Sequence, residues 1–359
     1  MSKKGGINLK AIIVILLIVV VALTGGIIYY LQGLGAVDPD NKDDVTVTIP
    51  NGSGASSIVY ILNDEGLIKN LTCARINAKF GGYDSLQANT YILNKSMTVT
   101  EMMNIINTGD FEYLSKSSFE MKEGCRLQQN AELLAQSIPY SAKEIMNVWN
   151  DKEYLHTLID KYWFLTDEIL NKDVMFPLEG YLYPDTYFIT DDNPTIESVT
   201  EMMLDQMDTQ LSSRRDQIEA SGFTVNEFLS LASIVCKEGG SNEAEAPHIA
   251  GVFINRLKQG MSLGSDVTVC YIYQEDRVDL RESQLNSTSK YNTRKYAGLT
   301  PGPICAVPAI DMDAVLNYVK TDDLFFYAGP DGTVYYATTN EGHSKNVQEH
   351  PWTEEDLAQ

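Results

Sequence analysis

The sequence predicts an α+β protein with one transmembrane helix at its N-terminus. Three observations support this fold class. A long apolar run lies near the start, short strand-like and helical patterns alternate in the first half, and helical periodicity dominates the second half before a closing hairpin. With 359 residues, the chain is long enough for two or three compact units that each have a core.

The N-terminal segment predicts a membrane anchor. Residues 1–10 carry three lysines and no acid, and residues 11–31 contain no charged side chain. An apolar run of this length crosses one bilayer. Because basic flanks stay in the cytoplasm, we expect a cytoplasmic stub at 1–10, a single-pass transmembrane helix at 11–31 in the cell membrane, and the remaining chain outside. A cleavable signal peptide, which has a shorter apolar core, is the alternative.

The composition excludes some classes of function. The formal charge of −22 argues against a nucleic-acid partner, because phosphate binding needs a basic surface. The five cysteines form no CxxC pair and the four histidines are scattered. The sequence therefore predicts no metal site and no other cofactor.

The segment after the anchor predicts small strand–helix units. Residues 32–44 are polar and turn-rich, as is typical of a linker. The stretch "VTIPNGSGASSIVYILND" then predicts a strand, a glycine turn and a helix, and "SFEMKEGCRLQQNAELLAQ" repeats this pattern with Gly124 on Gly52. Coincidence is the alternative explanation of this weak match. Between the two, Thr98 and Glu101 predict a capping box at the start of another helix.

The second half predicts a larger and mostly helical region. Residues 139–175 form a helical connector, and helices continue over 195–260 with a break at Ser221-Gly222. After Gly264 we expect irregular chain with short strands. The stretch "FFYAGPDGTVYYAT" then predicts a hairpin, because apolar runs flank a Pro-Asp-Gly turn.

The stretch "TVNEFLSLASIVCKEGG" places an acid at an unusual position. Thr224 and Glu227 predict a capping box, and the two glycines predict the helix end. Glu238 lies in the last turn on the same face as Leu231, Ile234 and Val235. Burial and the helix dipole both raise the pKa of such a carboxyl group, as a general acid requires. Alternatively, the chain bends after Gly239 and Glu238 reaches water.

Polar residues follow in the next helical stretch. The segment "APHIAGVFINRLKQG" predicts an amphipathic helix with Asn255 and Arg256 at its middle, and the polar turn "SLGSD" comes next. Polar groups that converge beside a lone carboxylic acid are typical of a sugar-binding cleft.

Five segments together carry a resemblance to one family. The chain contains, in order, "FPLEGYLYPDTYF", "ASIVCKE", "GVFINRL", "MSLGSDVTVCY" and "YNTRKYAGLTPGPI". It resembles the endolytic murein transglycosylase family, also called YceG-like, over nearly all of residues 10–350. The resemblance implies a LysM-like α/β module at 45–138, before the connector, and an α+β catalytic domain at 176–359.

The resemblance also implies the catalytic acid. The acid after the lysine in the family's "IVxKE" stretch corresponds to Glu238. Many relatives carry another glutamate two residues earlier, where this chain has Cys236. We therefore expect Glu238 to be the essential acid and Cys236 to be a small packing residue.

The other motifs imply a set of substrate-binding residues. Asn255, Asp266, Tyr291 and Asn292 are expected to bind sugar hydroxyl and acetamido groups. Glu179 is expected to support the site from behind or to form a contact between domains. The alternative is structural, with Asp266 as a turn or cap residue and Asn255 as a buried hydrogen-bonding residue.

The implied reaction cuts the β-1,4 bond between N-acetylmuramic acid and N-acetylglucosamine in nascent strands. It leaves a 1,6-anhydro end and sets glycan chain length during wall synthesis. Glu238 serves both proton transfers, because the nucleophile is the C6 hydroxyl of the substrate itself. The expected partners are peptidoglycan glycan strands and the plasma membrane, with peptidoglycan synthases or division proteins as further candidates.

Two alternatives remain open on the sequence alone. One is an inverting peptidoglycan hydrolase with Glu238 as acid and Asp266 as base. The other is a wall-binding scaffold with little activity. His343 is expected to be a loop residue rather than a ligand.

Overall fold

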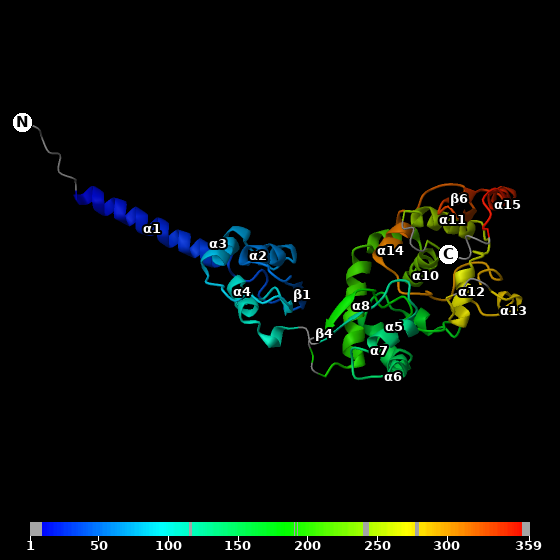
Figure 1. Ribbon diagram of the computed structural model, residues 1–359, viewed down its shortest axis with the longest axis horizontal. Coiled ribbons are helices and arrows are strands. Elements are labelled where there is room, and N and C mark those ends of the chain that lie inside the picture. The colour runs from blue at the N-terminus through cyan, green and yellow to red at the C-terminus, as the bar shows by residue number, and fades with distance from the viewer. Residues whose placement is uncertain are drawn as a thin grey trace, which may run out of the picture. The chain divides into compact units, whose positions relative to one another are not determined.

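The computed structural model describes residues 9–114, 117–189, 191, 193–239, 244–276 and 280–353. The chain divides into two compact units (Figure 1). The first comprises Met1–Ser117 with Phe188–Asp192, and the second comprises Ser118–Tyr187 with Asn193–Gln359. The described residues form helices and small two-stranded sheets, which confirms the predicted α+β class.

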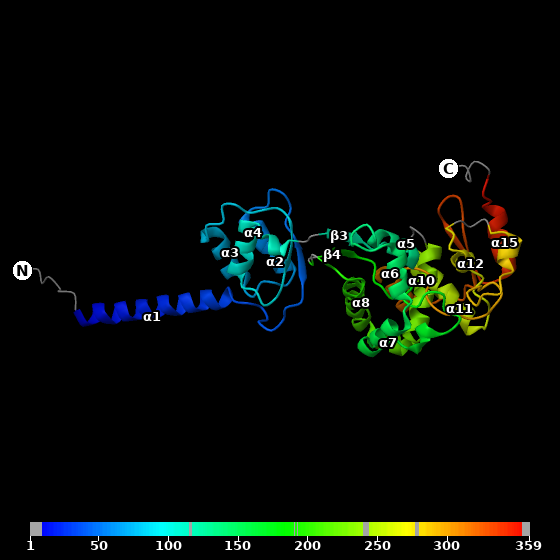
Figure 2. The ribbon, with the colours of Figure 1, turned by 90° about the horizontal axis from the view of Figure 1, so that it is seen from below.

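The first unit begins with one long apolar helix. Helix α1 spans Leu9–Gly33, its segment Ile15–Gly33 has a mean hydropathy of 2.2, and residues 15–29 are exposed. Figure 2 shows α1 as a single straight rod. Its length and composition suit a membrane crossing, as predicted for residues 11–31.

The rest of the first unit is a strand–helix–helix–strand motif followed by a further helix. Strands β1 and β2 pair antiparallel, with Val47 opposite Tyr91. Thr98 and Glu101 form the predicted capping box of α4. The elements are β1 (Val45–Thr48), α2 (Ala55–Asp64), α3 (Leu71–Phe80), β2 (Thr90–Leu93), α4 (Val99–Thr108) and the 3₁₀ helix η1 (Phe111–Tyr113).

The segment predicted as a linker is in part packed structure. Helix α1 ends at Gly33, and Leu34 is buried in the core of the first unit. The Leu34 carbonyl accepts a hydrogen bond of 2.9 Å from the backbone N–H of Val99. The start of the 32–44 segment is therefore fixed by apolar burial and backbone pairing, which its polar composition did not indicate.

The predicted repeat has the expected local structure, but its second copy belongs to the second unit. Gly52 and Gly124 both adopt positive φ, 80° and 64°, after strands β1 and β3 (Ser117–Glu120). The prediction that the first module extends to residue 138 is wrong, because β3 pairs with β4 (Thr186–Ile189) and Gly124 donates a backbone hydrogen bond of 2.9 Å to Ala306. These pairings are distant in sequence, so the local pattern could not reveal them.

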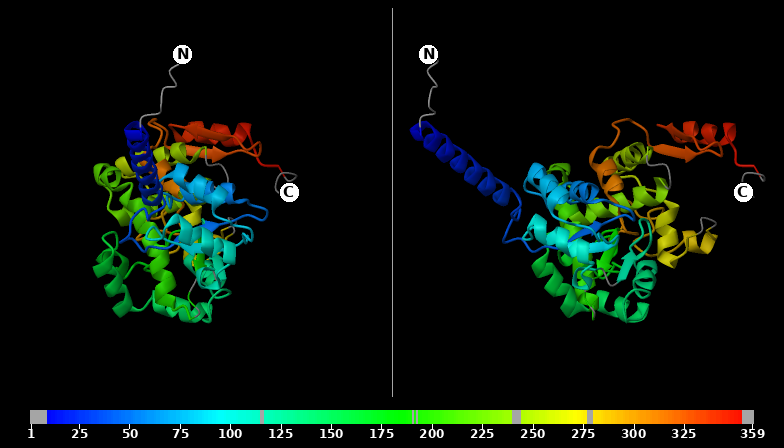
Figure 3. Two further views of the ribbon diagram at one scale, coloured as in Figure 1. Left: turned by 90° about the vertical axis from the view of Figure 1, so that its left-hand side faces the viewer. Right: turned by 60° about the vertical axis from the view of Figure 1, so that its left-hand side comes forward.

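The second unit is mostly helical and closes with a hairpin. Its first helices are α5 (Leu127–Leu134), α6 (Ala142–Trp149), α7 (Lys152–Lys161), η2 (Asp167–Leu170), α8 (Ile196–Ser212), α9 (Arg215–Ser221) and α10 (Val225–Gly239). Then follow α11 (Ala246–Lys258), α12 (Asp266–Tyr273), α13 (Glu282–Leu285), α14 (Ala309–Leu316), β5 (Phe325–Ala328), β6 (Val334–Ala337) and α15 (Asn340–Glu349). The predicted break at Gly222 and the predicted hairpin are confirmed, and Figure 3 shows α15 beside that hairpin.

Residues 266–273 are a helix, although short strands were expected after Gly264. Their β-branched side chains favour a strand locally. However, Asp266 lies in the first helical turn, where a carboxylate is stabilised by the helix dipole, and Thr268 to Tyr271 are buried against the core. Tertiary packing therefore overrides the local preference.

Helix α10 is the central helix of the second unit. It packs against α11, α12 and α14, and every residue from Phe228 to Val235 is buried. Ser233 Oγ donates a hydrogen bond of 2.8 Å to the Ser230 carbonyl and accepts one of 3.0 Å from the backbone N–H of Ile304. The buried hydroxyl of Ser230 has no hydrogen-bond partner among the described residues. Because α10 packs against these three helices, its last turn has a defined position in the second unit.

Candidate active site

Glu238 lies in the last turn of α10, just after the buried stretch from Phe228 to Val235. The predicted capping box begins the helix: Glu227 N–H donates to Thr224 Oγ1 at 3.2 Å, and Thr224 N–H donates to Glu227 Oε2 at 2.9 Å. The helix ends at Gly239. Glu238 is mostly buried, with part of the residue still accessible to solvent.

The turn "SLGSD" holds the carboxyl group of Glu238. Ser265 Oγ donates a hydrogen bond of 2.6 Å to Glu238 Oε1. Ser265 itself is 4% exposed, and its backbone N–H donates to Thr293 Oγ1 at 3.1 Å. Gly264 N–H donates to the Thr293 carbonyl at 3.0 Å. Hydrogen bonds thus join two of the segments that carry the family resemblance, "MSLGSDVTVCY" and "YNTRKYAGLTPGPI", next to Glu238.

Burial raises the pKa of Glu238 above its ordinary value. The Ser265 hydrogen bond lowers this pKa, the carboxylate of Asp266 raises it, and the guanidinium of Arg256 lowers it, but the raising effects are larger. Arg256 is held in place by the carbonyls of Leu263 and Leu324 and by the ring of Phe325 at 5.1 Å. The acid therefore keeps its proton to a higher pH than an exposed glutamate does.

Glu238 opens into a cavity of about 280 Å³. This volume is at the small end of ligand pockets. Side chains from α10, α11, α12, β5, α15 and the turn before α12 meet here. The lining residues are Glu238, Phe253, Arg256, Leu263, Gly264, Ser265, Asp266, Val267, Phe326 and His343. We call this space the Glu238 cavity.

Asp266 is the one predicted substrate-binding residue that lines the Glu238 cavity. Its Oδ1 forms an ion pair of 2.6 Å with Arg294 Nη1. Both side chains remain well exposed, at 40% and 44%. Asp266 therefore stands at the mouth of the cavity as a partly neutralised carboxylate.

The other predicted residues lie behind the cavity. Asn255 Nδ2 donates to the carbonyls of Thr321 and Asp323, at 2.8 and 3.0 Å, and so holds the chain that leads into β5. Asn292 is fully buried, and its Nδ2 donates to the carbonyls of Leu285 and Ser287.

Tyr291 is also fully buried, with its ring 4.9 Å from that of Tyr271. Like Asn255 and Asn292, Tyr291 is not among the residues that line the Glu238 cavity.

Glu179 is a second buried acid, away from the Glu238 cavity. It is 1% exposed, and both its oxygens accept from the backbone N–H of Leu127, at 3.0 and 3.1 Å. Burial raises the pKa of Glu179 to about 8, although the Leu127 hydrogen bond and the nearby Tyr271 hydroxyl oppose the shift. Glu179 thus fixes the first turn of α5.

Several residues of the site have no clear signal in the sequence. Ser265 was visible only as part of a polar turn. His343 was expected in a loop, but it lies on α15, stacks on Phe325 at 5.6 Å and lines the Glu238 cavity. Burial, and then the charge of Arg256, lower the pKa of His343, so the imidazole is neutral near pH 7. Only the fold brings α15 to α10, and no spacing in the sequence signals this.

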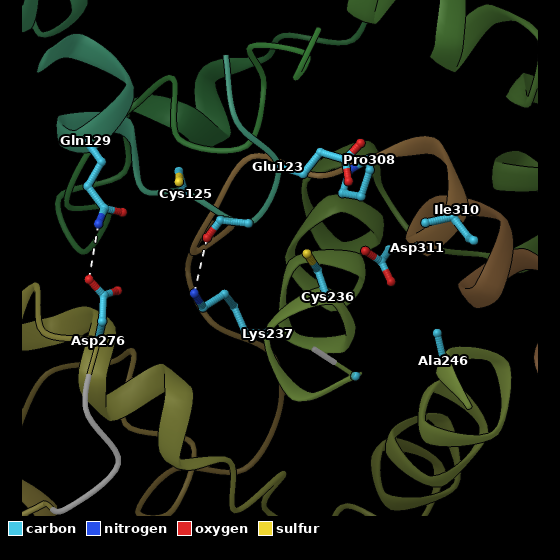
Figure 4. Close-up of a pocket in the computed structure, with 12 residues that line it drawn as sticks. Glu123, Cys125, Gln129, Cys236, Lys237, Ala246, Asp276, Pro308, Ile310 and Asp311 are labelled. Carbon is cyan, nitrogen blue, oxygen red and sulfur yellow. Dashed lines mark hydrogen bonds between the residues drawn. The ribbon is translucent and has the colours of Figure 1, made fainter. Parts of the chain in front are cut away.

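A second cavity borders the last turn of α10 (Figure 4). Its volume is about 480 Å³. Cys236 and Lys237 line it, whereas Glu238 lines the first cavity. The full lining is Glu123, Gly124, Cys125, Gln129, Cys236, Lys237, Gly239, Ala246, Asp276, Pro308, Ile310 and Asp311. We call this space the Lys237 cavity.

Comparisons with known proteins agree with this arrangement. A model of the YceG-like family matches residues 47–349. The endolytic murein transglycosylase of Bacillus subtilis (strain 168) is 31% identical over 322 residues, which cover 89% of each chain. The endolytic murein transglycosylase of Streptococcus pneumoniae serotype 2 (strain D39 / NCTC 7466) is 34% identical over 342 residues, and the match spans 90% of this chain and 62% of that relative.

A solved structure is similar over most of the fold. The crystal structure of a YceG-like protein from Listeria monocytogenes superposes with a TM-score of 0.62 at 32% identity, covering 85% of this chain and 99% of that one. The family match, the relatives and the shared fold extend over both units of the chain. The chain therefore belongs to the YceG-like family.

Proposed function

We propose that this chain is an endolytic murein transglycosylase that cuts glycan strands of peptidoglycan. The observation that carries the proposal is Glu238 itself: a mostly buried carboxyl group with a raised pKa, held by Ser265 in a cavity that Arg256 and Asp266 also line. Relatives with about a third of their residues identical bear this activity in their names. The enzyme class is a lytic transglycosylase acting on a polysaccharide.

In the proposed mechanism, Glu238 first acts as a general acid. Its proton passes to the glycosidic oxygen as the bond from that oxygen to C1 of the muramic acid residue breaks. The departing strand keeps this oxygen as a hydroxyl group. Ser265 and Arg256 then stabilise the Glu238 carboxylate by hydrogen bonding and by positive charge.

Glu238 next acts as a base. The carboxylate accepts the proton of the C6 hydroxyl while O6 bonds to C1, which closes the 1,6-anhydro ring and restores the acid. No water is consumed, so one carboxyl group suffices, whereas a hydrolase needs a second carboxylate for the water. Asp266 is the candidate for that second group, but its ion pair with Arg294 favours a role in contacting the glycan.

The remaining predicted residues are proposed as supports of the cleft. Asn255 and Asn292 hold backbone carbonyls that shape it, and Tyr291 and Glu179 pack behind it. The first unit is proposed to be a LysM-like glycan-binding module. Its strand–helix–helix–strand order supports this. Helix α1 is proposed to anchor the chain in the cell membrane with the N-terminus in the cytoplasm.

Product analysis tests the proposal. Uncrosslinked murein strands are incubated with the protein, and the fragments are identified by mass spectrometry. Anhydro-muramic ends are expected, and they should be absent with Glu238→Gln. Reducing ends from the wild type would replace the proposal by an inverting hydrolase, and the absence of any cleavage would leave a wall-binding scaffold.

A further inference from the structure

The Lys237 cavity contains a cation that the proposed mechanism does not use. Lys237 Nζ donates one hydrogen bond, of 3.2 Å, to the Gly124 carbonyl. Among the residues that the structure describes, no carboxylate forms an ion pair with it. This is notable in a chain of formal charge −22. A cation at a cavity wall with a carbonyl as its partner has capacity for an anionic group.

Carboxylates line the same cavity. Asp276 is engaged by Arg126, which approaches it with two nitrogens, and by Gln129 Nε2 at 3.1 Å. Glu123 is exposed, and Asp311 lies near Cys236 in Figure 4. The lining thus combines the ammonium group of Lys237 with the carboxylates of Glu123, Asp276 and Asp311. A purely anionic ligand would be repelled by the acids and a purely cationic one by Lys237, so the lining favours a ligand with both charges.

The position of the cavity relates it to the cleavage site. Lys237 and Glu238 are consecutive residues, so their Cα atoms lie about 3.8 Å apart, and their side chains leave the helix about 100° apart. A ligand group on Lys237 therefore lies in a cavity that borders the same last turn of α10 as the cavity of the general acid. Murein strands carry, on the lactyl group of each muramic acid residue, a short peptide that bears carboxylate and ammonium groups.

We propose that the Lys237 cavity is a subsite for this peptide stem. A stem carboxylate binds to Lys237, and a stem ammonium group faces Glu123 and Asp311. The glycan lies in the Glu238 cavity while its peptide passes into the neighbouring one. This inference rests on the proposed function and adds to it a recognition of the peptide beside that of the sugar.

The test compares two substrates of one glycan length, one with its peptide stems and one from which an amidase has removed them. For the wild type, kcat/KM should be higher with the stems. Lys237→Met should lower the ratio of the two kcat/KM values about tenfold, which is the effect of losing a hydrogen bond between charged groups. Lys237→Arg should keep most of the ratio. Lys258→Met, on the exposed surface of α11, is the matched control.

A direct measurement accompanies the kinetics. Calorimetry should show that the synthetic tripeptide L-Ala-γ-D-Glu-L-Lys binds to the Glu238→Gln protein and about tenfold more weakly to the double variant with Lys237→Met. The subsite would be overturned if Lys237→Met lowered kcat/KM equally on both substrates. It would also be overturned if the Glu238→Gln protein and the double variant bound the tripeptide equally. Failure of the wild type to release anhydro ends from either substrate would instead refute the proposed function, so the two failures are distinguishable.

Discussion

Ser265 Oγ and Glu238 Oε1 are 2.6 Å apart, and the serine donates to the acid. Ser265 occupies the N-cap position of α12, yet its hydroxyl makes no capping hydrogen bond there. The hydroxyl that usually satisfies a helix end is used for the carboxyl group of another helix. The protonation of Glu238 is thus linked to the position of the loop before α12.

Ser265→Ala should shift the pH profile of cleavage. Ser265 lowers the pKa of Glu238, so its removal raises that pKa further and moves the alkaline limb of the rate to higher pH. The maximal rate should fall roughly tenfold, because the carboxylate formed in the first step loses a charge-assisted hydrogen bond. Rates of anhydro-end release across pH 5–9 measure both effects. Ser262→Ala, in the same turn, serves as control and should keep the wild-type profile.

Glu238→Gln should abolish cleavage without destabilising the fold. Loss of a general acid costs on the order of a hundred- to ten-thousand-fold in rate. The pKa of Glu238 is raised in the folded state, so its stabilising contribution is complete below the unfolded pKa and is lost as pH rises through the folded pKa. At neutral pH the neutral amide should therefore unfold at the same or higher denaturant concentration than the wild type.

Glu282→Gln, an exposed acid on α13, is the control for that experiment and should change neither quantity. A Glu238→Gln protein that is clearly less stable at pH 7 would contradict the raised pKa.

Glu179 should make the second unit more stable in mild acid than at alkaline pH. Its pKa rises from 4.5 to about 8 on folding. The contribution of Glu179 to the free energy of unfolding is therefore complete below pH 4.5. It declines as pH rises to about 8, by a few kcal/mol in total. The difference in unfolding free energy between wild type and Glu179→Gln, measured from pH 5 to 9, isolates this group. A difference that stays constant over this range would show that Glu179 is not protonated at neutral pH.

Asp266→Asn should separate the two chemistries. In a lytic transglycosylase the change weakens glycan contacts and leaves partial activity, whereas in a hydrolase it removes the base and costs as much as the loss of Glu238. Asp313→Asn is the matched control, since Asp313 is also a half-exposed aspartate paired with an arginine, Arg214, at 2.7 Å. Reducing ends from the wild type together with full loss in Asp266→Asn would establish the hydrolase.

Gly180→Ala should be far more damaging than Gly222→Ala. Both glycines have positive φ, 75° and 81°, so both alanines are strained by about 1 kcal/mol. At Gly180 a Cβ would also lie 2.3 Å from Pro303 Cβ, whereas at Gly222 it would meet nothing within 4 Å. Denaturant unfolding should show an additional loss of roughly 1–3 kcal/mol for Gly180→Ala. Equal losses would mean that the contact with Pro303 relaxes freely.

Local signals allowed much of the fold to be predicted. The apolar run, the capping box at Thr224 and the turn of the β5–β6 hairpin each depend on residues that are neighbours in sequence, and each is present in the structure. The predicted boundary at residue 138 differs from the observed one at Ser117–Ser118, because residues after Ser118 contact distant parts of the second unit, as in the backbone hydrogen bond from Gly124 to Ala306. A strand–turn–helix pattern does not reveal its partner.

The site could be predicted only in part for the same reason. Glu238 was marked by its own helix, but Ser265, Arg256 and His343 reach it through the fold. Tyr291 and Asn292 were expected at the substrate because they are polar and lie in a family segment. The structure uses their polarity instead to satisfy buried backbone groups.

The two carbonyls bound by Arg256 connect the width of the Glu238 cavity to the strength of its acid. The guanidinium joins Leu263, in the turn before α12, to Leu324, at the start of the hairpin, and both segments border the cavity. A glycan that forced these walls apart would have to break one of the bonds and draw the positive charge away from Glu238. The acid would then hold its proton more firmly when the cleft is stretched and yield it more readily once the walls return. The width of the Glu238 cavity and the pKa of Glu238 therefore change together. A substrate too wide for the cavity would meet a Glu238 that gives up its proton less readily.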